Sequence, residues 1–239
     1  MRLYMGDAST PALTKCRERA PEHTFGRVWT PELRRYGTPY IVDNGEYQAM
    51  RRGVEWEVEE WRDVLNVAVE RPFPPDFVVL PDVYNDAEAT LARHREHIDA
   101  VRSRDLRPAA VLQPGMDAVT QVRLAEQIGA GVVFVGGDNR WKRAVGEEIV
   151  TEAHDRGMAV HVGNPGLPGG LKWAQGIGVD SVDTSSVVAS EAYHHLDELG
   201  SLSRGCRKKG GKQSTLLTDG GRRNSVSEST DTDRTGDSP

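Results

Sequence analysis

The chain has 239 residues, of which 37% are hydrophobic, and 30 Lys and Arg against 36 Asp and Glu give a formal net charge of −6. This length suits one large domain or two small ones, and the lack of any run of 18 apolar residues argues against a membrane-spanning helix. The two cysteines, Cys16 and Cys206, exclude a disulfide framework and an all-cysteine zinc site. Because the first residues also lack the apolar stretch of a secretory signal, we expect a soluble cytoplasmic protein.

Seven short apolar runs follow one another along the chain, made mostly of branched or aliphatic side chains. Runs of this kind predict strands that are buried on both faces of a sheet. Stretches with helical spacing of apolar residues lie between the later runs, at 86–105, 116–130 and 140–157. The predicted strands lie within residues 2–7, 39–45, 76–82, 108–115, 131–138, 158–164 and 178–185.

The alternation of strands and helices predicts a parallel sheet with right-handed crossovers. Its short repeat favours a TIM-type (β/α) barrel over residues 1–200 rather than a doubly wound sheet. A closed barrel needs eight strands. The eighth is expected within residues 8–38 or within 57–70, which otherwise has the pattern of a helix. The sequence therefore leaves open whether the barrel is complete or irregular.

Residues 201–239 differ in composition from the rest of the chain. They carry eight Lys and Arg against five acids, a balance of +3, which leaves −9 for residues 1–200. They are rich in Gly, Ser and Thr and contain no aromatic residue. Such a segment buries too little apolar surface to offset the entropy of ordering, so we expect a disordered C-terminal tail.

Polar side chains and glycines follow almost every predicted strand. Because parallel strands of a barrel end at the same face, these residues are expected to meet at one mouth. Buried carboxylates are costly unless they are paired or used, so several at consecutive strand ends favour a functional site. The residues expected at this mouth are Asp43, Asp82, Gln113, Gly115, Gly136, Gly137 and Asp183.

Several of these residues also have ordinary structural explanations. An Asp after a strand is a common helix N-cap, so Asp82 or Asp138 could serve only to cap the next helix. Gly136 and Gly137 allow close approach of a flat ligand to the main chain, but they also suit a phosphate. His161 either lines the pocket or is a satisfied core histidine.

The order of these motifs resembles the tRNA-guanine transglycosylase superfamily, in particular its short zinc-less relatives that insert 7-deazaguanine bases into DNA or tRNA. The resemblance covers about residues 36–190. It implies a TIM-type barrel and a pentosyltransferase that exchanges guanine in a nucleic acid for a 7-deazaguanine. The matching segments are Asp43–Gln48, Asp82, Gln113–Gly115, Gly136–Gly137 and Gly178–Asp183.

The resemblance also implies roles for individual residues. Asp183 would be the nucleophile that forms a covalent intermediate with the sugar, and Asp43 the general acid and base. Asp180 is less suited to be the nucleophile. Lys142 would contact a phosphate or pair with an acid, or else be a solvated lysine at a helix start. The base would be bound by Tyr47, Asp82, Gln113, Gly115, Met116, Gly136 and Gly137.

The family's zinc site is absent here, because Cys206 is the only cysteine downstream of the last motif. His194 and His195 are assigned to a helix surface, and we expect neither a metal nor a cofactor. The expected partners are a nucleic acid, DNA or tRNA, and a free 7-deazaguanine base, with a homodimer left open. Two alternatives remain: a phosphate-binding barrel hydrolase or lyase that acts on a small metabolite, and a catalytically silent binding subunit of a full-length relative.

Overall fold

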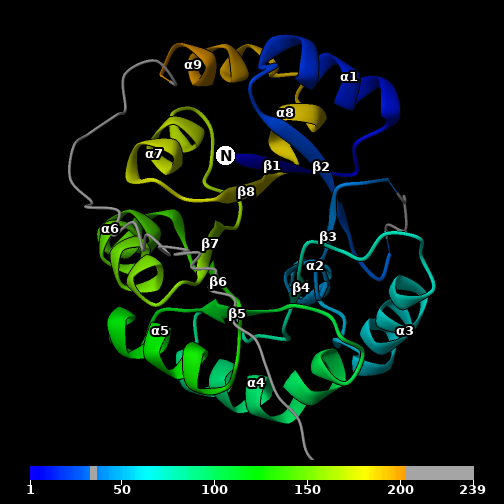
Figure 1. Ribbon diagram of the computed structural model, residues 1–239, viewed down its shortest axis with the longest axis vertical. Coiled ribbons are helices and arrows are strands. Elements are labelled where there is room, and N and C mark those ends of the chain that lie inside the picture. Colours follow the sequence, from blue (N-terminus) through cyan, green and yellow to red (C-terminus); the bar gives the residue numbers. More distant parts are fainter. Residues whose placement is uncertain (33–36, 203–239) are drawn as a thin grey trace, which may run out of the picture. The chain divides into compact units, whose positions relative to one another are not determined.

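The computed structural model describes residues 1–32 and 37–202. Within them, parallel strands close into a barrel in which each strand pairs with the next along the chain and β8 pairs with β1 (Figure 1). This confirms the predicted TIM-type barrel and shows that its ring is complete. The strands are β1 Arg2–Gly6, β2 Thr24–Trp29, β3 Tyr40–Val42, β4 Val78–Val79, β5 Pro108–Leu112, β6 Val132–Val135, β7 Ala159–Val162 and β8 Ser181–Thr184.

The strand without a clear apolar run in the sequence is β2. It pairs in parallel with β1, with Leu3 opposite Phe25. Gly26 and Arg27 interrupt its apolar residues, so the sequence shows no continuous apolar run at this strand. Gly26 is needed there, because a Cβ at this position would lie 2.5 Å from the carbonyl oxygen of Pro39 and 2.8 Å from Cδ1 of Tyr4. The other expected location, residues 57–70, forms helix α3.

Helices follow the strands and surround the barrel (Figure 1). The three helices predicted between the later strands are present as α4, α5 and α6. The helices in the described part of the chain are α1 Thr10–Arg19, α2 Glu46–Arg52, α3 Val58–Val69, α4 Ala87–Arg102, α5 Ala118–Gln127, α6 Asn139–Asp155, α7 Gly170–Ile177, α8 Ser186–Ala189 and α9 His194–Leu202.

The core has an inner part and an outer part, because successive strand residues point to opposite faces of the sheet. Along β6, Phe134 packs inside the barrel with residues such as Tyr4 and Phe77. Its neighbours Val133 and Val135 instead pack outward against the helices. The same alternation along β8 puts Val182 in the outer core and leaves Ser181 and Asp183 on the inner face. The inner face of β8 therefore places Asp183 toward the carboxyl end of the barrel and Ser181 toward the opposite end.

Apart from Ser201 and Leu202, which end α9, the predicted disordered tail lies outside the described residues. Along residues 1–32 and 37–202, none of the helices combines the length and the apolar character that crossing a membrane requires.

Candidate active site

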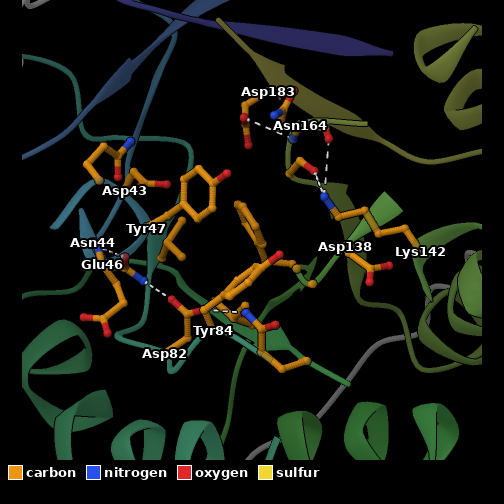
Figure 2. Close-up of a pocket in the computed structure, with 18 of the residues that line it drawn as sticks. Asp43, Asn44, Glu46, Tyr47, Asp82, Tyr84, Asp138, Lys142, Asn164 and Asp183 are labelled. Carbon is orange, nitrogen blue, oxygen red and sulfur yellow. Dashed lines mark hydrogen bonds between the residues drawn. The ribbon is translucent and has the colours of Figure 1, made fainter. Parts of the chain in front are cut away.

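A pocket of about 300 Å³ opens at the carboxyl ends of the strands (Figure 2). This is the end at which TIM-barrel enzymes place their chemistry. Two of the residues expected there, Gly115 and Met116, do not line it. Met116 lies instead beside a smaller cavity between α4, α5 and the sheet. The expected residues that do line the pocket are Asp43, Tyr47, Asp82, Gln113, Gly136, Gly137, Lys142 and Asp183.

Asp43 follows β3 and lies at one side of the pocket (Figure 2). Its Oδ1 accepts a hydrogen bond of 2.9 Å from the backbone N–H of Gly45, whose positive φ of 80° turns the chain into α2. Burial, together with the neighbouring carboxylates of Asp183 and Asp82, raises the pKa of Asp43 to about 7 against the lowering effect of the Gly45 N–H. A carboxyl group with this pKa exchanges protons readily near neutral pH.

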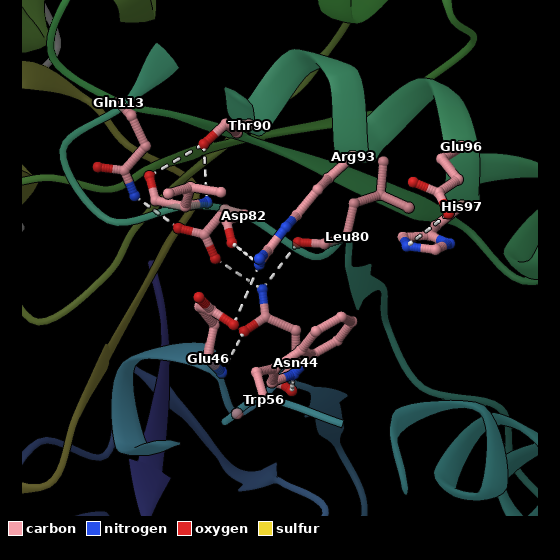
Figure 3. Close-up of polar contacts among 12 residues, drawn as sticks. Asn44, Glu46, Trp56, Leu80, Asp82, Thr90, Arg93, Glu96, His97 and Gln113 are labelled. Atoms are coloured by element: carbon pink, nitrogen blue, oxygen red, sulfur yellow. Dashed lines mark hydrogen bonds and ion pairs between the residues drawn. The ribbon is translucent and has the colours of Figure 1, made fainter. Parts of the chain in front are cut away.

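Asp82 follows β4 and is held by two amide side chains (Figure 3). Asn44 Nδ2 donates to Oδ1 over 2.8 Å, and Gln113 Nε2 donates to Oδ2 over 2.6 Å. Burial raises the pKa of Asp82 to about 6, although both amide hydrogen bonds favour the charged form and lower it. Gln113 therefore orients a carboxylate, and its predicted contact with a base stays a prediction.

The contacts around Asp82 extend away from the pocket (Figure 3). Asn44 Nδ2 also donates to the carbonyl oxygen of Leu80 over 2.8 Å. Arg93 donates to the backbone oxygen of Asp82 over 2.7 Å, and its NH1 lies 3.2 Å from Oε2 of Glu46. These contacts tie the loops after β3 and β4 to helix α4. No role was predicted for Asn44 or Arg93 from the sequence. Asn44 could have been included, because it lies directly beside Asp43 in the strand-end motif.

Asp183 faces the pocket from the last inward position of β8. Its Oδ2 lies 2.9 Å from Nε2 of His161, and its Oδ1 accepts from the backbone N–H of Asn164 over 3.3 Å. His161 has no exposed surface and packs below the pocket against Phe134, with ring centroids 4.7 Å apart. His161 is thus a core histidine bonded to a pocket residue rather than part of the lining. Asp180 lies outside the pocket, where its Oδ2 accepts from the backbone N–H of Val160 over 2.8 Å.

Lys142 lies in the first turn of α6 with 6% of its surface exposed. Its Nζ donates to the backbone carbonyl oxygens of Gly163 and Asn164. Burial lowers the pKa of Lys142 to about 8, partly offset by the carboxylates of Asp183 and Asp138. The alternative of a solvated lysine is therefore wrong. The amine is a buried cation with two backbone partners, and it lines the pocket.

The glycines of the loop after β6 are required by neighbouring side chains. A Cβ on Gly136 would lie 2.8 Å from Nε2 of Gln113, and one on Gly137 would lie 2.8 Å from Cδ of Pro114. The backbone N–H of Gly136 donates to the carbonyl oxygen of Leu112 over 2.9 Å, so it is not free to bind a base. The predicted main-chain approach of a flat ligand is not needed to explain these residues.

The mouth of the pocket carries a tyrosine pair that the sequence analysis did not predict. The rings of Tyr47 and Tyr84 lie 5.7 Å apart between centroids, and Tyr47 is 46% exposed. Tyr47 was expected to stack a base against Met116, which is elsewhere. Tyr84 lies two residues after Asp82, and its place in the same strand-end loop could have predicted it as a pocket residue. Among the residues that the structure describes, no group of three or more His, Cys, Asp or Glu side chains is arranged to hold a metal ion.

Comparison with known proteins gives similarity at the level of the fold. No protein-family model matches the chain, and no curated protein matches it. Similar solved structures include a 3-hexulose-6-phosphate synthase from Salmonella typhimurium, at 12% identity and a TM-score of 0.48, covering 83% of this chain and 97% of that one. The YdjI aldolase from Escherichia coli K12 is similar at 12% identity and a TM-score of 0.46, covering 84% of this chain and 89% of that one.

A 2,3-dimethylmalate lyase, described as a member of the PEP mutase/isocitrate lyase superfamily, is also similar, at 15% identity and a TM-score of 0.40. That likeness covers 75% of this chain and 65% of the lyase, so the chain spans less than two thirds of the lyase's length. These values describe a shared barrel architecture. They do not indicate a shared substrate.

The predicted resemblance to tRNA-guanine transglycosylases is wrong, and with it the predicted base exchange on a nucleic acid. The similar structures are lyase, synthase and aldolase barrels, and no family model supports the resemblance. The physical reason is that Asp, Gln-Pro-Gly and Gly-Gly at strand ends are features that many parallel barrels share. The roles as nucleophile and base-binding residues rested on that resemblance. The nucleic-acid and deazaguanine partners, and a homodimer, stay predictions that no observation tests.

Proposed function

We propose that this protein is an enzyme, a lyase that cleaves a small, uncharged hydroxycarbonyl compound by acid–base catalysis. The observation that carries the proposal is the carboxyl of Asp43, with a pKa of about 7, in one pocket with Asp183 and the buried amine of Lys142. A general acid or base works best when its pKa lies near the working pH. Asp43 meets this condition because of its burial.

The size and charge of the pocket favour a small substrate without a phosphate. Its volume of about 300 Å³ lies at the lower end of the range of small-molecule sites. Among the described residues, five with carboxyl side chains and one cation, Lys142, line it, and Lys142 Nζ keeps one N–H beyond the two that donate to carbonyl oxygens. A dianionic phosphate would be repelled by this lining. The lining acids are Asp43, Glu46, Asp82, Asp138 and Asp183.

Each of the three central groups has a place in such a cleavage. Asp183 accepts the proton of the substrate hydroxyl, the adjacent carbon–carbon bond breaks, and its electron pair moves to the carbonyl oxygen as an enolate. Lys142 stabilises the negative charge on that oxygen, as a positioned cation does in a water-poor site. Asp43, in its protonated form, then delivers a proton to the carbon of the enolate. One proton is taken up and one released, so the cleavage is balanced.

Asp82 contributes orientation in this proposal. Its two oxygens are fixed by Asn44 and Gln113, so its remaining lone pairs point in a defined direction and can accept from substrate hydroxyls. Gln113 is in turn fixed, because its Oε1 accepts from the backbone N–H of Asn85 over 3.1 Å. The tyrosine pair at the mouth would limit the entry of water once a substrate is bound.

The enolate half-reaction provides a test that needs no knowledge of the full substrate. Dihydroxyacetone, hydroxyacetone and acetoin are incubated with the protein in D₂O, and exchange of their α-protons is followed by NMR. We expect exchange above the buffer rate with at least one hydroxyketone. We expect Asp43→Asn to slow it about 10²-fold or more, as is typical for loss of a general acid–base group. Asp63→Asn, on the exposed face of α3, is the matched control.

The outcomes are distinct. Exchange that Asp43→Asn leaves unchanged would show that Asp43 does not move the proton. No exchange of any of the three compounds above buffer would overturn the assignment of enolate chemistry to this pocket. Exchange of dihydroxyacetone phosphate in preference to dihydroxyacetone would overturn the proposed exclusion of phosphorylated substrates.

A further inference from the structure

A second open cavity, of about 520 Å³, lies at the opposite end of the barrel. We call it the lower cavity. It is formed where the strands begin, so it lies on the face away from the candidate active site. Among its lining residues are Arg2, Thr24, Phe77, Val132, Ala159 and Ser181.

A line of hydrogen-bonded groups connects the pocket with the lower cavity. Oδ2 of Asp183, in the pocket, lies 2.9 Å from Nε2 of His161. Nδ1 of the same ring lies 2.8 Å from Oγ of Ser181, which lines the lower cavity. The three residues are inward positions of the adjacent strands β7 and β8, which pair with His161 opposite Ser181. Both nitrogens of the buried ring are therefore occupied, one toward each end of the barrel.

Aromatic rings surround this line of groups. The ring of His161 lies 4.7 Å from Phe134, 5.1 Å from Phe77 and 6.0 Å from Tyr4 between centroids. The hydroxyl of Tyr4 donates to Asp76, so it is not a partner of the imidazole. Apolar side chains at all three of these inward positions would fill the barrel without leaving polar groups to satisfy. The observed polar line therefore needs an explanation other than packing.

We propose that His161 and Ser181 form a proton relay between Asp183 and solvent in the lower cavity. In the tautomer with the proton on Nε2, the Ser181 hydroxyl donates to Nδ1 and Nε2–H donates to Asp183. A hydronium ion in the lower cavity gives a proton to Ser181 Oγ, the hydroxyl proton moves to Nδ1, and the Nε2 proton moves to Asp183. Each broken O–H or N–H bond is matched by one formed, and the hydronium ion is left as water. The reverse sequence returns the proton.

The consequence is that Asp183 can gain or lose a proton while a substrate fills the pocket. This inference deepens the proposed function, since Asp183 is its base, but the relay itself is testable without any substrate. His161 and Ser181 would act through Asp183 and so are positioning residues rather than catalytic ones. The alternative is that His161 only orients the carboxylate, and then protons would enter and leave through the pocket.

The test is the rate at which the ring N–H of His161 exchanges with water, measured by ¹H–¹⁵N NMR on histidine-labelled protein. The chain has seven histidines, and a His161→Gln variant assigns the signal. Without a relay, a ring with no exposed surface exchanges only when the barrel opens. Asp183→Asn removes the acid at the pocket end. The amide N–H of this Asn can donate to Nε2, which places the ring proton on Nδ1 beside Ser181, so we expect exchange to continue through the Ser181 hydroxyl.

Adding Ser181→Ala to Asp183→Asn should slow exchange about 10²-fold, the lower end of what a positioned proton-transfer group contributes. Ser181→Thr, which keeps a hydroxyl, should restore it. Ala159→Met should slow exchange with every relay atom intact, because it fills the lower cavity. Ser186→Ala, a serine outside the line, is the control.

Two results would overturn the relay. Exchange that stops in Asp183→Asn alone would mean that the proton leaves through the pocket. Exchange that Ser181→Ala and Ala159→Met both leave unchanged would exclude the lower cavity as the exit. Because no substrate is present, these results are independent of whether the lyase assay succeeds.

Discussion

Burial and hydrogen bonding act in opposite directions on the carboxyls of the pocket. Asp43 receives one backbone N–H bond and its pKa rises to about 7, whereas Asp82 receives two amide bonds and its pKa rises only to about 6. The donors favour the charged form of both groups, while the carboxylates of Asp183 and Asp82 raise the pKa of Asp43 and Arg93 lowers that of Asp82. Neighbouring side chains thus suit Asp43 to proton transfer and Asp82 to binding.

The raised pKa of Asp43 predicts a cost in stability above neutral pH. Because the folded protein holds this proton more tightly than the unfolded chain does, the contribution of Asp43 to stability falls as the pH rises from about 4 to about 7. Asp43→Asn, which does not titrate, should be more stable than the parent at pH 8 by on the order of 2 kcal/mol. Urea denaturation at pH 4.5 and pH 8 measures this, and the difference should nearly vanish at the lower pH. An equal difference at both pH values would contradict the assignment.

At the scale of elements, the aspartates after the strands divide into two groups. Asp86, Asp117 and Asp138 accept from the backbone N–H of the third residue after them and cap α4, α5 and α6. Asp43 directly follows β3, Asp82 lies three residues after the end of β4, and their oxygens bind other partners. The capping explanation that the sequence allowed for Asp138 therefore holds, and for Asp82 it does not. Asp138 belongs to both groups, because it caps α6 and also lines the pocket.

The cap of α4 offers a direct test of this division. Oδ1 of Asp86 accepts from the N–H of Ala89 over 3.0 Å. Asp86→Ala should lower the free energy of unfolding by about 1 kcal/mol, the usual loss for an N-cap, and Asp86→Ser should recover most of it. Urea denaturation of the three proteins gives the comparison. A serine variant as unstable as the alanine variant would show that the charge of Asp86, not its capping bond, stabilises the helix.

At the scale of the whole molecule, closure of the barrel buries polar groups that must stay neutral. His94 on α4 packs against β5, where its Nε2 accepts from the backbone N–H of Val111 over 3.3 Å. Burial, with a smaller contribution from the nearby His97, lowers the pKa of His94 to about 3. Protonating His94 would break this bond and place a charge between helix and sheet. Acid should therefore weaken the contact between α4 and the barrel.

The contribution of His94 to stability therefore changes with pH in the opposite direction to that of Asp43. It falls as the pH falls, whereas the contribution of Asp43 falls as the pH rises. A histidine with a lowered pKa in the folded state contributes stability above its unfolded pKa of about 6.5, and that contribution is lost as the pH falls below it. His94→Gln should therefore flatten the fall in stability between pH 6.5 and pH 5, measured by urea denaturation at several pH values. His194→Gln, at the exposed start of α9, should leave the slope unchanged. A slope that His94→Gln does not alter would show that other groups cause the acid sensitivity.

The sequence by itself determined the barrel class and which strand ends carry polar side chains, because local apolar periodicity and chain order are enough to fix both. It placed the eighth strand within residues 8–38 or 57–70 without deciding between them, because Gly26 and Arg27 interrupt the apolar pattern of β2, where Gly26 is required by the close approach of Tyr4 and Pro39. It also suggested the transglycosylase family, from Asp, Gln-Pro-Gly and Gly-Gly motifs that many parallel barrels share at their strand ends.

Only the tertiary structure decided how the polar groups pair. Gln113 meets Asp82 across 31 positions of sequence, and His161 meets Asp183 across 22, through bonds that depend on strand register. The pKa values of Asp43 and Lys142 follow from burial, which a local pattern does not specify. The chemistry of the site is therefore a property of the closed barrel, because closure brings these groups together and removes water from around them.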